Sequence, residues 1–102
     1  MPVFLGFGEN QATGFNLATA ADAGGYRPVL NTRRSRGTLA APTAVANNDY
    51  LASFVSSGYD GSTFQNPATI DFYVDGTPSS GNVPGRISFV TGSNAGNRLE
   101  RL

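Results

Sequence analysis

The side chains that could carry out chemistry in this chain of 102 residues are few in kind. Histidine, cysteine and lysine are all absent. The commonest general base, the thiolate nucleophile and the amine of a Schiff base or phosphate-binding loop are therefore missing. Carboxylates, arginine, tyrosine and serine are what remains for catalysis.

Asp71 and Asp75 are the carboxylate pair that could act as a glycosidase couple. On one strand they would share a face but lie about 13 Å apart, at about 3.3 Å per residue. Glycosidases hold their two carboxyl groups about 5 to 9.5 Å apart. We therefore predict no catalytic residue and no enzymatic activity, with Asp71 on a solvated strand face and Asp75 in a turn. Closer carboxylates supplied by a neighbouring copy remain open.

Arg33, Arg34 and Arg36 form the one cluster of charge in the chain. Such a cluster could contact a phosphate or an acidic glycan. Alternatively, it belongs to a strand whose arginines point to both faces and pair with carboxylates such as Glu100 on the same or another chain. We favour the second interpretation, because three arginines in a chain of zero net charge produce a weak field.

Tyr59, Phe64 and Tyr73 are aromatic side chains that could stack on sugars. The chain is poor in large apolar residues, so we favour their burial in a core or between copies of the chain. Sugar stacking by an exposed aromatic remains the alternative for these three residues.

The composition also limits cofactors and partners. A net charge of zero argues against nucleic-acid binding, which depends on an excess of Lys and Arg. Without Cys and His a zinc site is not expected, and no acidic run resembles a calcium loop, so we predict no cofactor and no metal. A single cation held by Asp60 or Asp75 remains open. No apolar run approaches the ~20 residues of a membrane span, so membrane insertion is not predicted.

Strict alternation over residues 68–75 predicts a strand with one apolar face. We expect Ile70, Phe72 and Val74 to be buried on this face, with Tyr73 on the other. Residues 86–91 and 50–56 alternate less strictly and predict two further strands, the second with Tyr50 on the side of Phe54. Residues 29–36 and 3–7 are weaker strand candidates. The best helix candidate, residues 16–23, is about two turns long and too short to be stable alone.

Glycine and proline lie between these strands, where turns require them. The overall prediction is an all-β fold of short strands and turns. Residues 1–30 are predicted to be an irregular segment, a candidate assembly or attachment arm, and residues 31–102 a β-rich module. The residues that we single out as structural turn residues are Gly58, Tyr59, Asp60, Gly61, Asp75, Gly76, Pro78, Pro84, Gly85 and Arg86.

The chain is short of material for a core of its own. It has 13 glycines and many Ala, Ser, Thr and Asn residues, each of which adds little apolar area. Small domains usually compensate with disulfides, a metal or oligomerisation, and disulfides are excluded here. Self-association is therefore expected.

Five segments together resemble a module of phage tail fibre proteins. They are RSRGTLAAPTAV (34–45), GYDGSTF (58–64), VDGTPSSG (74–81), PGRISF (84–89) and RLERL (98–102). The resemblance covers about the last seventy residues, and in similar proteins the module lies upstream of chaperone domains of the endosialidase type. It implies an intertwined or side-by-side homotrimer in a fibre, without catalysis of its own.

The expected function is therefore that of a structural, self-associating component of a bacteriophage tail fibre that also contributes to host-surface attachment. Its expected partners are copies of itself, other virion or tail proteins, and a glycan or receptor of the host surface. Its expected location is the virion, and the extracellular space after host lysis. The alternatives are a small glycan-binding fibre tip and a capsid-decorating accessory protein.

Overall fold

The computed structural model describes residues 5–101 and contains no helix in that range. Its strands pair in antiparallel sheets, which confirms the predicted all-β class. The chain separates into two units, Met1–Asn31 and Thr32–Leu102.

Residues 5–31 form neither strand nor helix, and every side chain among them is exposed. The helix considered at residues 16–23 does not form, since two turns followed by Gly24 and Gly25 cannot offset the cost of nucleation. Two of the weaker strand predictions also fail. Residues 5–7 are irregular, whereas residues 3 and 4 lie outside the described part, and of residues 29–36 only Arg36 belongs to a strand.

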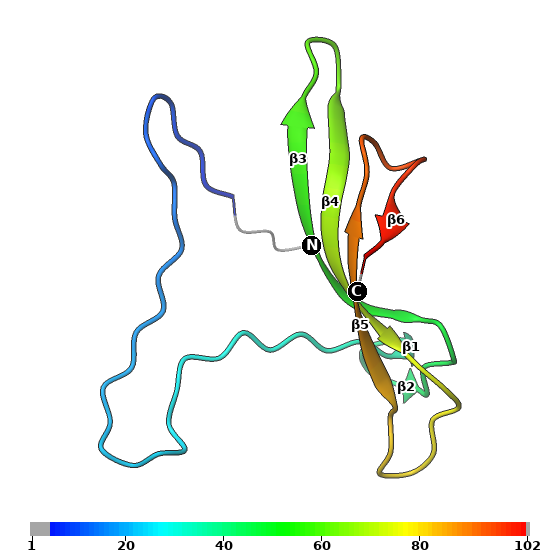
Figure 1. The fold of residues 1–102 in the computed structure, drawn as a ribbon. Coiled ribbons are helices and arrows are strands. Elements are labelled where there is room, and N and C mark those ends of the chain that lie inside the picture. Colours follow the sequence, from blue (N-terminus) through cyan, green and yellow to red (C-terminus); the bar gives the residue numbers. More distant parts are fainter. Residues whose placement is uncertain (1–4, 102) are drawn as a thin grey trace. The chain divides into compact units, whose positions relative to one another are not determined.

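Residues 32–101 form two antiparallel sheets (Figure 1). The smaller sheet joins β1 (Arg36–Gly37) to β2 (Pro42–Thr43). The larger sheet has the order β3-β4-β5-β6, in which each strand pairs with the next one along the chain. Its strands are β3 (Tyr50–Tyr59), β4 (Phe64–Val74), β5 (Gly85–Thr91) and β6 (Leu99–Glu100). The three strands predicted from alternation are confirmed.

The register of β3, β4 and β5 places most of their large apolar side chains on one face of the sheet. Phe54 lies opposite Ile70, which lies opposite Phe89. Successive side chains of a strand point to opposite faces, so the neighbouring positions belong to the other side of the sheet. We call one side the apolar face; the buried Val74 lies at one end of it, and its other side chains on these strands are Ala52, Phe54, Ser56, Ala68, Ile70, Phe72, Ile87, Phe89 and Thr91.

A β-bulge at the start of β3 changes the predicted pattern. Tyr50 lies opposite Tyr73, and the next paired residue, Ala52, lies opposite Phe72, so that Leu51 is an extra residue in β3. The prediction that placed Tyr50 on the side of Phe54 is wrong. The extra residue turns the Tyr50 ring to the side of Tyr73, where the two ring centroids are 4.4 Å apart.

Among the described residues, Val74 is the only buried hydrophobic side chain. The predicted burial of Val74 is correct, but Ile70 and Phe72 are only half-buried. Apart from Val74, the large side chains of the apolar face stay exposed or half-buried. The buried polar residues lie on the other face, in the two central strands, where short side chains are shielded by their neighbours: Thr69, Asp71 and Ser88.

Candidate functional site

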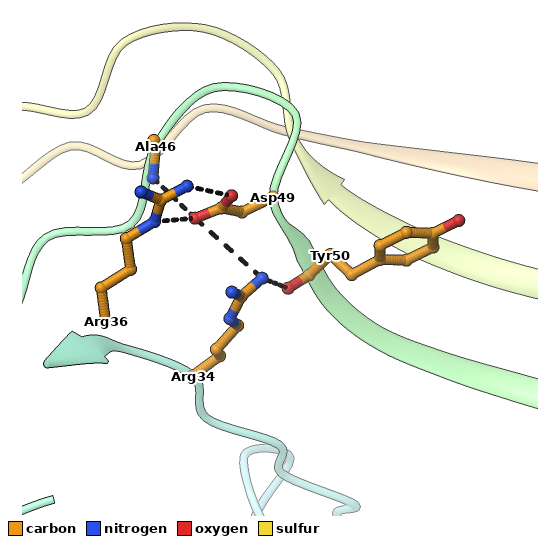
Figure 2. A network of polar contacts seen from close by, with 5 residues as sticks. All are labelled: Arg34, Arg36, Ala46, Asp49 and Tyr50. Carbon is orange, nitrogen blue, oxygen red and sulfur yellow. Dashed lines mark hydrogen bonds and ion pairs between the residues drawn. The ribbon is translucent and has the colours of Figure 1, made fainter. Parts of the chain in front are cut away.

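The arginine cluster forms a clamp around Asp49, the residue just before β3 (Figure 2). Arg36 donates from Nε and Nη2 to the two carboxylate oxygens of Asp49, both at 2.8 Å. Such a bidentate pair matches the planar geometry of both groups. Arg34 lies 4.0 Å from the same carboxylate and donates at 2.7 Å to the backbone carbonyl of Tyr50.

The electrostatics of the clamp favour its charged form. The hydrogen bond from Arg36 lowers the pKa of Asp49 well below its ordinary value, and the backbone N–H of Ala46 contributes in the same direction. The same hydrogen bond raises the pKa of Arg36. Arg34 and Arg36 are therefore engaged within the chain and are poorly available for a phosphate or an acidic glycan.

The clamp departs from the prediction in two ways. Arg33 and Arg34 lie outside any strand, because the expected strand is reduced to Arg36 and Gly37. The carboxylate partner is Asp49 and not Glu100, which accepts a hydrogen bond of 2.8 Å from the Ser88 hydroxyl. Within residues 5–101, Arg33 is exposed and takes part in no ion pair.

The end of β3 and the turn that joins it to β4 contain the first group of predicted turn residues: Gly58, Tyr59, Asp60 and Gly61. The Asp60 carboxylate accepts hydrogen bonds from the backbone N–H groups of Ser62 and Thr63, at 2.8 and 2.9 Å. These bonds, with that of Thr63 the largest cause, lower the pKa of Asp60. This arrangement holds the turn and leaves Asp60 with a structural role.

Tyr59 and Phe64 flank this turn with their ring centroids 5.2 Å apart. Tyr59 is 61% exposed and Phe64 is 70% exposed. Burial of these rings in a core of the single chain, one of the two favoured outcomes, is therefore wrong. An interface between copies and an exposed stacking surface remain for this pair.

The second group of turn residues shapes the connection between β4 and β5. Asp75 donates its backbone N–H to the carbonyl of Pro84 at 2.9 Å, and Gly76 donates to the Asn47 side chain at 2.7 Å. Gly76 has a φ of 133°, which glycine adopts readily. Pro78 lies in the loop between these residues, Gly85 begins β5, and the Arg86 guanidinium is 3.3 Å from the Asp75 carboxylate.

Tyr73 is packed between Tyr50 and Arg86. The Arg86 guanidinium lies 4.4 Å from the centroid of the Tyr73 ring, within the range of a cation–π interaction. Burial, followed by the hydrogen bond with Tyr50, raises the pKa of Tyr73 to about 12. The Tyr73 ring is thus half-buried and engaged by Tyr50 and Arg86 of its own chain.

Asp71 contradicts the prediction of a solvated carboxylate. Its side chain is buried and accepts hydrogen bonds from the hydroxyls of Ser53, at 2.7 Å, and Thr69, at 2.9 Å. Ser53 lies directly opposite Asp71, a proximity that depends on strand register and that no sequence pattern revealed. Because the carboxylate is buried and bonded to hydroxyls, it is poorly placed to act on an external substrate.

No group of three or more His, Cys, Asp or Glu residues in the described part is arranged to hold a metal ion. No helix within residues 5–101 is long and apolar enough to cross a membrane. Comparison with known protein families and with characterised proteins finds no match for this chain. The arrangements found are a clamp, two ordered turns and an open apolar face.

Proposed function

We propose that this chain is a structural, self-associating component of a bacteriophage tail fibre, and that its working form is a homotrimer without catalytic activity. The proposal depends on one observation: the single chain lacks a hydrophobic core of its own. Val74 is the only buried hydrophobic residue of the described part, while a sheet face with five large apolar side chains is open. A fold of this kind needs partners to cover its apolar side.

The proposed trimer and the proposed place in a tail fibre rest on the resemblance to tail fibre modules. The segments that carry it coincide with ordered features: residues 34–45 supply Arg34 and Arg36 of the clamp and form the small sheet, and residues 58–64 include the β3–β4 turn. Residues 74–81 and 84–89 build the connection into β5. The proposed location is the virion, with other tail proteins and the host surface as further partners.

A second candidate function is glycan binding at the β3–β4 turn. It is favoured by the exposed rings of Tyr59 and Phe64, which lie next to the polar side chains of Asp60 and Gln65. Stacking of sugars on aromatic rings beside hydrogen-bonding groups is a common mode of recognition. Loss of binding to host polysaccharide in Tyr59→Ala and Phe64→Ala, without a change in assembly, would support it.

Native mass spectrometry and sedimentation equilibrium of the full chain test the main proposal. We expect a species of three times 10.6 kDa. A folded monomer at every concentration would contradict the proposal and would favour the capsid-accessory alternative.

A further inference from the structure

We infer that the apolar face of β3, β4 and β5 is the surface on which a second copy of this chain packs. The inference rests on the self-association proposed above and assigns it to one side of one sheet. It is carried by the chemistry of the face, by its shape, and by the exposure of its large side chains.

The residues that make up the apolar face are uncharged, and one cation reaches its edge: Arg101 donates from Nε to the Thr91 hydroxyl at 2.8 Å. Besides the buried Val74, the members of this face are alanine, serine, threonine, isoleucine and phenylalanine, and three of the large ones are well exposed: 55% for Phe54, 52% for Ile87 and 41% for Phe89. The charged residues of the same strands, Asp71 and Arg86, lie on the other face. Away from the end where Arg101 contacts Thr91, two copies of the apolar face can therefore meet without bringing like charges together, which would otherwise oppose self-association.

The apolar face also has a hollow whose size suits an aromatic side chain. A hollow of about 260 Å³ lies on it, lined on this side by Phe54, Ser56, Ala68, Ile70, Phe89 and Thr91. Across the strands, Ile70 lies between Phe54 and Phe89, and the smaller side chains of Ser56, Ala68 and Thr91 form the adjacent row. An apolar cavity of about 150 Å³ is enough to hold benzene, so the hollow has room for a phenyl ring of a facing copy.

A copy of the chain fits this face better than a sugar does. The face offers Ser56 and Thr91 as its hydrogen-bonding side chains, both at one end, whereas ligand sites combine apolar area with several convergent polar groups. A facing copy brings apolar rings and small side chains in the same arrangement.

Single cysteines can test the inference directly, because the natural chain has none. We would compare Ala68→Cys, on the apolar face, with Ser80→Cys, in the exposed β4–β5 loop, by the rate of reaction with a maleimide. In the assembled protein we expect Ala68→Cys to react at least about tenfold more slowly than Ser80→Cys. Dilution below the dissociation concentration should remove that protection and leave Ser80→Cys unchanged.

The outcomes separate this inference from the proposed function. If the assembled protein leaves Ala68→Cys as reactive as Ser80→Cys, the apolar face is not the interface, although self-association stands. If a monomer protects Ala68→Cys, the chain's own N-terminal segment covers the face and the inference is wrong. A monomer with a reactive Ala68→Cys overturns both.

A second pair of variants tests whether the apolar face contributes to the affinity between copies of the chain. Phe89→Ser removes a ring from the apolar face, and Val83→Ser removes a similarly exposed side chain from the β4–β5 loop. We expect Phe89→Ser to raise the dissociation constant about tenfold or more, as for a residue central to an interface, and Val83→Ser to leave it unchanged. Equal effects of the two variants would overturn the inference.

Discussion

Asp49 links three separate segments of the chain. Its carboxylate binds Arg36 and the backbone N–H of Ala46, and its backbone carbonyl accepts a hydrogen bond of 2.8 Å from Val74. The residue thus ties the small sheet to the end of β4, beside the one buried hydrophobic side chain. Charge and hydrogen bonding stabilise a region where apolar burial is scarce.

We predict that Arg36→Met lowers the melting temperature most at neutral pH. The pKa of Asp49 is lowered in the folded state from its ordinary value of 3.8, so the clamp stabilises the fold fully above that value. Its contribution is lost as the pH falls from 3.8 through the lowered pKa. The difference between the wild type and Arg36→Met should therefore shrink at about pH 2.5, as measured by circular dichroism.

Arg33→Met is the matched control for this experiment. Arg33 is exposed and makes no ion pair within the described part, so its replacement should leave the melting temperature nearly unchanged at both pH values. A loss equal to that of Arg36→Met would mean that net charge, and not the clamp, stabilises the fold.

Replacement of Asp71 and replacement of Asp75 should lower the free energy of unfolding by unequal amounts. Asp71→Ala leaves the hydroxyls of Ser53 and Thr69 without their buried acceptor, and we expect a loss of about 1 to 3 kcal/mol. Asp75→Ala removes an exposed ion pair with Arg86, which we expect to cost less than about 1 kcal/mol. Urea unfolding of both variants measures the difference, and equal losses would contradict the assigned burial of Asp71.

At the scale of elements, two of the turns depend on backbone conformations that few residues adopt. Gly76, with a φ of 133°, follows β4, and a Cβ atom there would lie 3.2 Å from the Pro84 ring. The turn between β3 and β4 contains Gly61, with a φ of 104°. The strands can pair in register only if these connections close correctly.

We predict that Gly76→Ala destabilises the fold by about 1 to 3 kcal/mol, because a side chain is strained at this φ and crowds Pro84. Gly58→Ala is the control: a Cβ at Gly58 meets nothing within 4 Å, and its φ is not positive. Alanine there should be neutral or slightly stabilising. Thermal unfolding of both variants tests the prediction, which fails if Gly76→Ala is as stable as the wild type.

At the scale of the whole molecule, folding and association should be one process. If copies of the chain complete the core, unfolding releases them, and mass action makes stability depend on protein concentration. We therefore predict that the melting temperature rises with concentration over a hundredfold dilution series, about as RT ln of the concentration ratio requires. Scanning calorimetry of the full chain measures it. An unchanged melting temperature would indicate that each chain folds alone.

The sequence by itself determined the local structure of residues 32–101. Alternation located β3, β4 and β5, and Asp-Gly and Pro-Gly pairs located the turns, because these signals come from side-chain direction and backbone conformation within a few residues. The absence of His, Cys and Lys limited, from the sequence alone, the catalytic chemistry that the chain could carry out. The weaker strands at residues 3–7 and 29–36 lacked a strict pattern, and no strand forms over the described part of them beyond Arg36.

Only the tertiary structure decided what each side chain meets. Asp71 is buried because register places Ser53 opposite it, and the extra residue Leu51 moves Tyr50 to the side of Tyr73. Arg36 pairs with Asp49, 13 positions along the chain, and not with Glu100. Register, bulges and long-range ion pairs depend on residues distant in sequence, so a local pattern carries no information about them. The open apolar face follows from the same fact: alternation predicts that a face is apolar, and only the packing of the whole chain determines whether anything covers it.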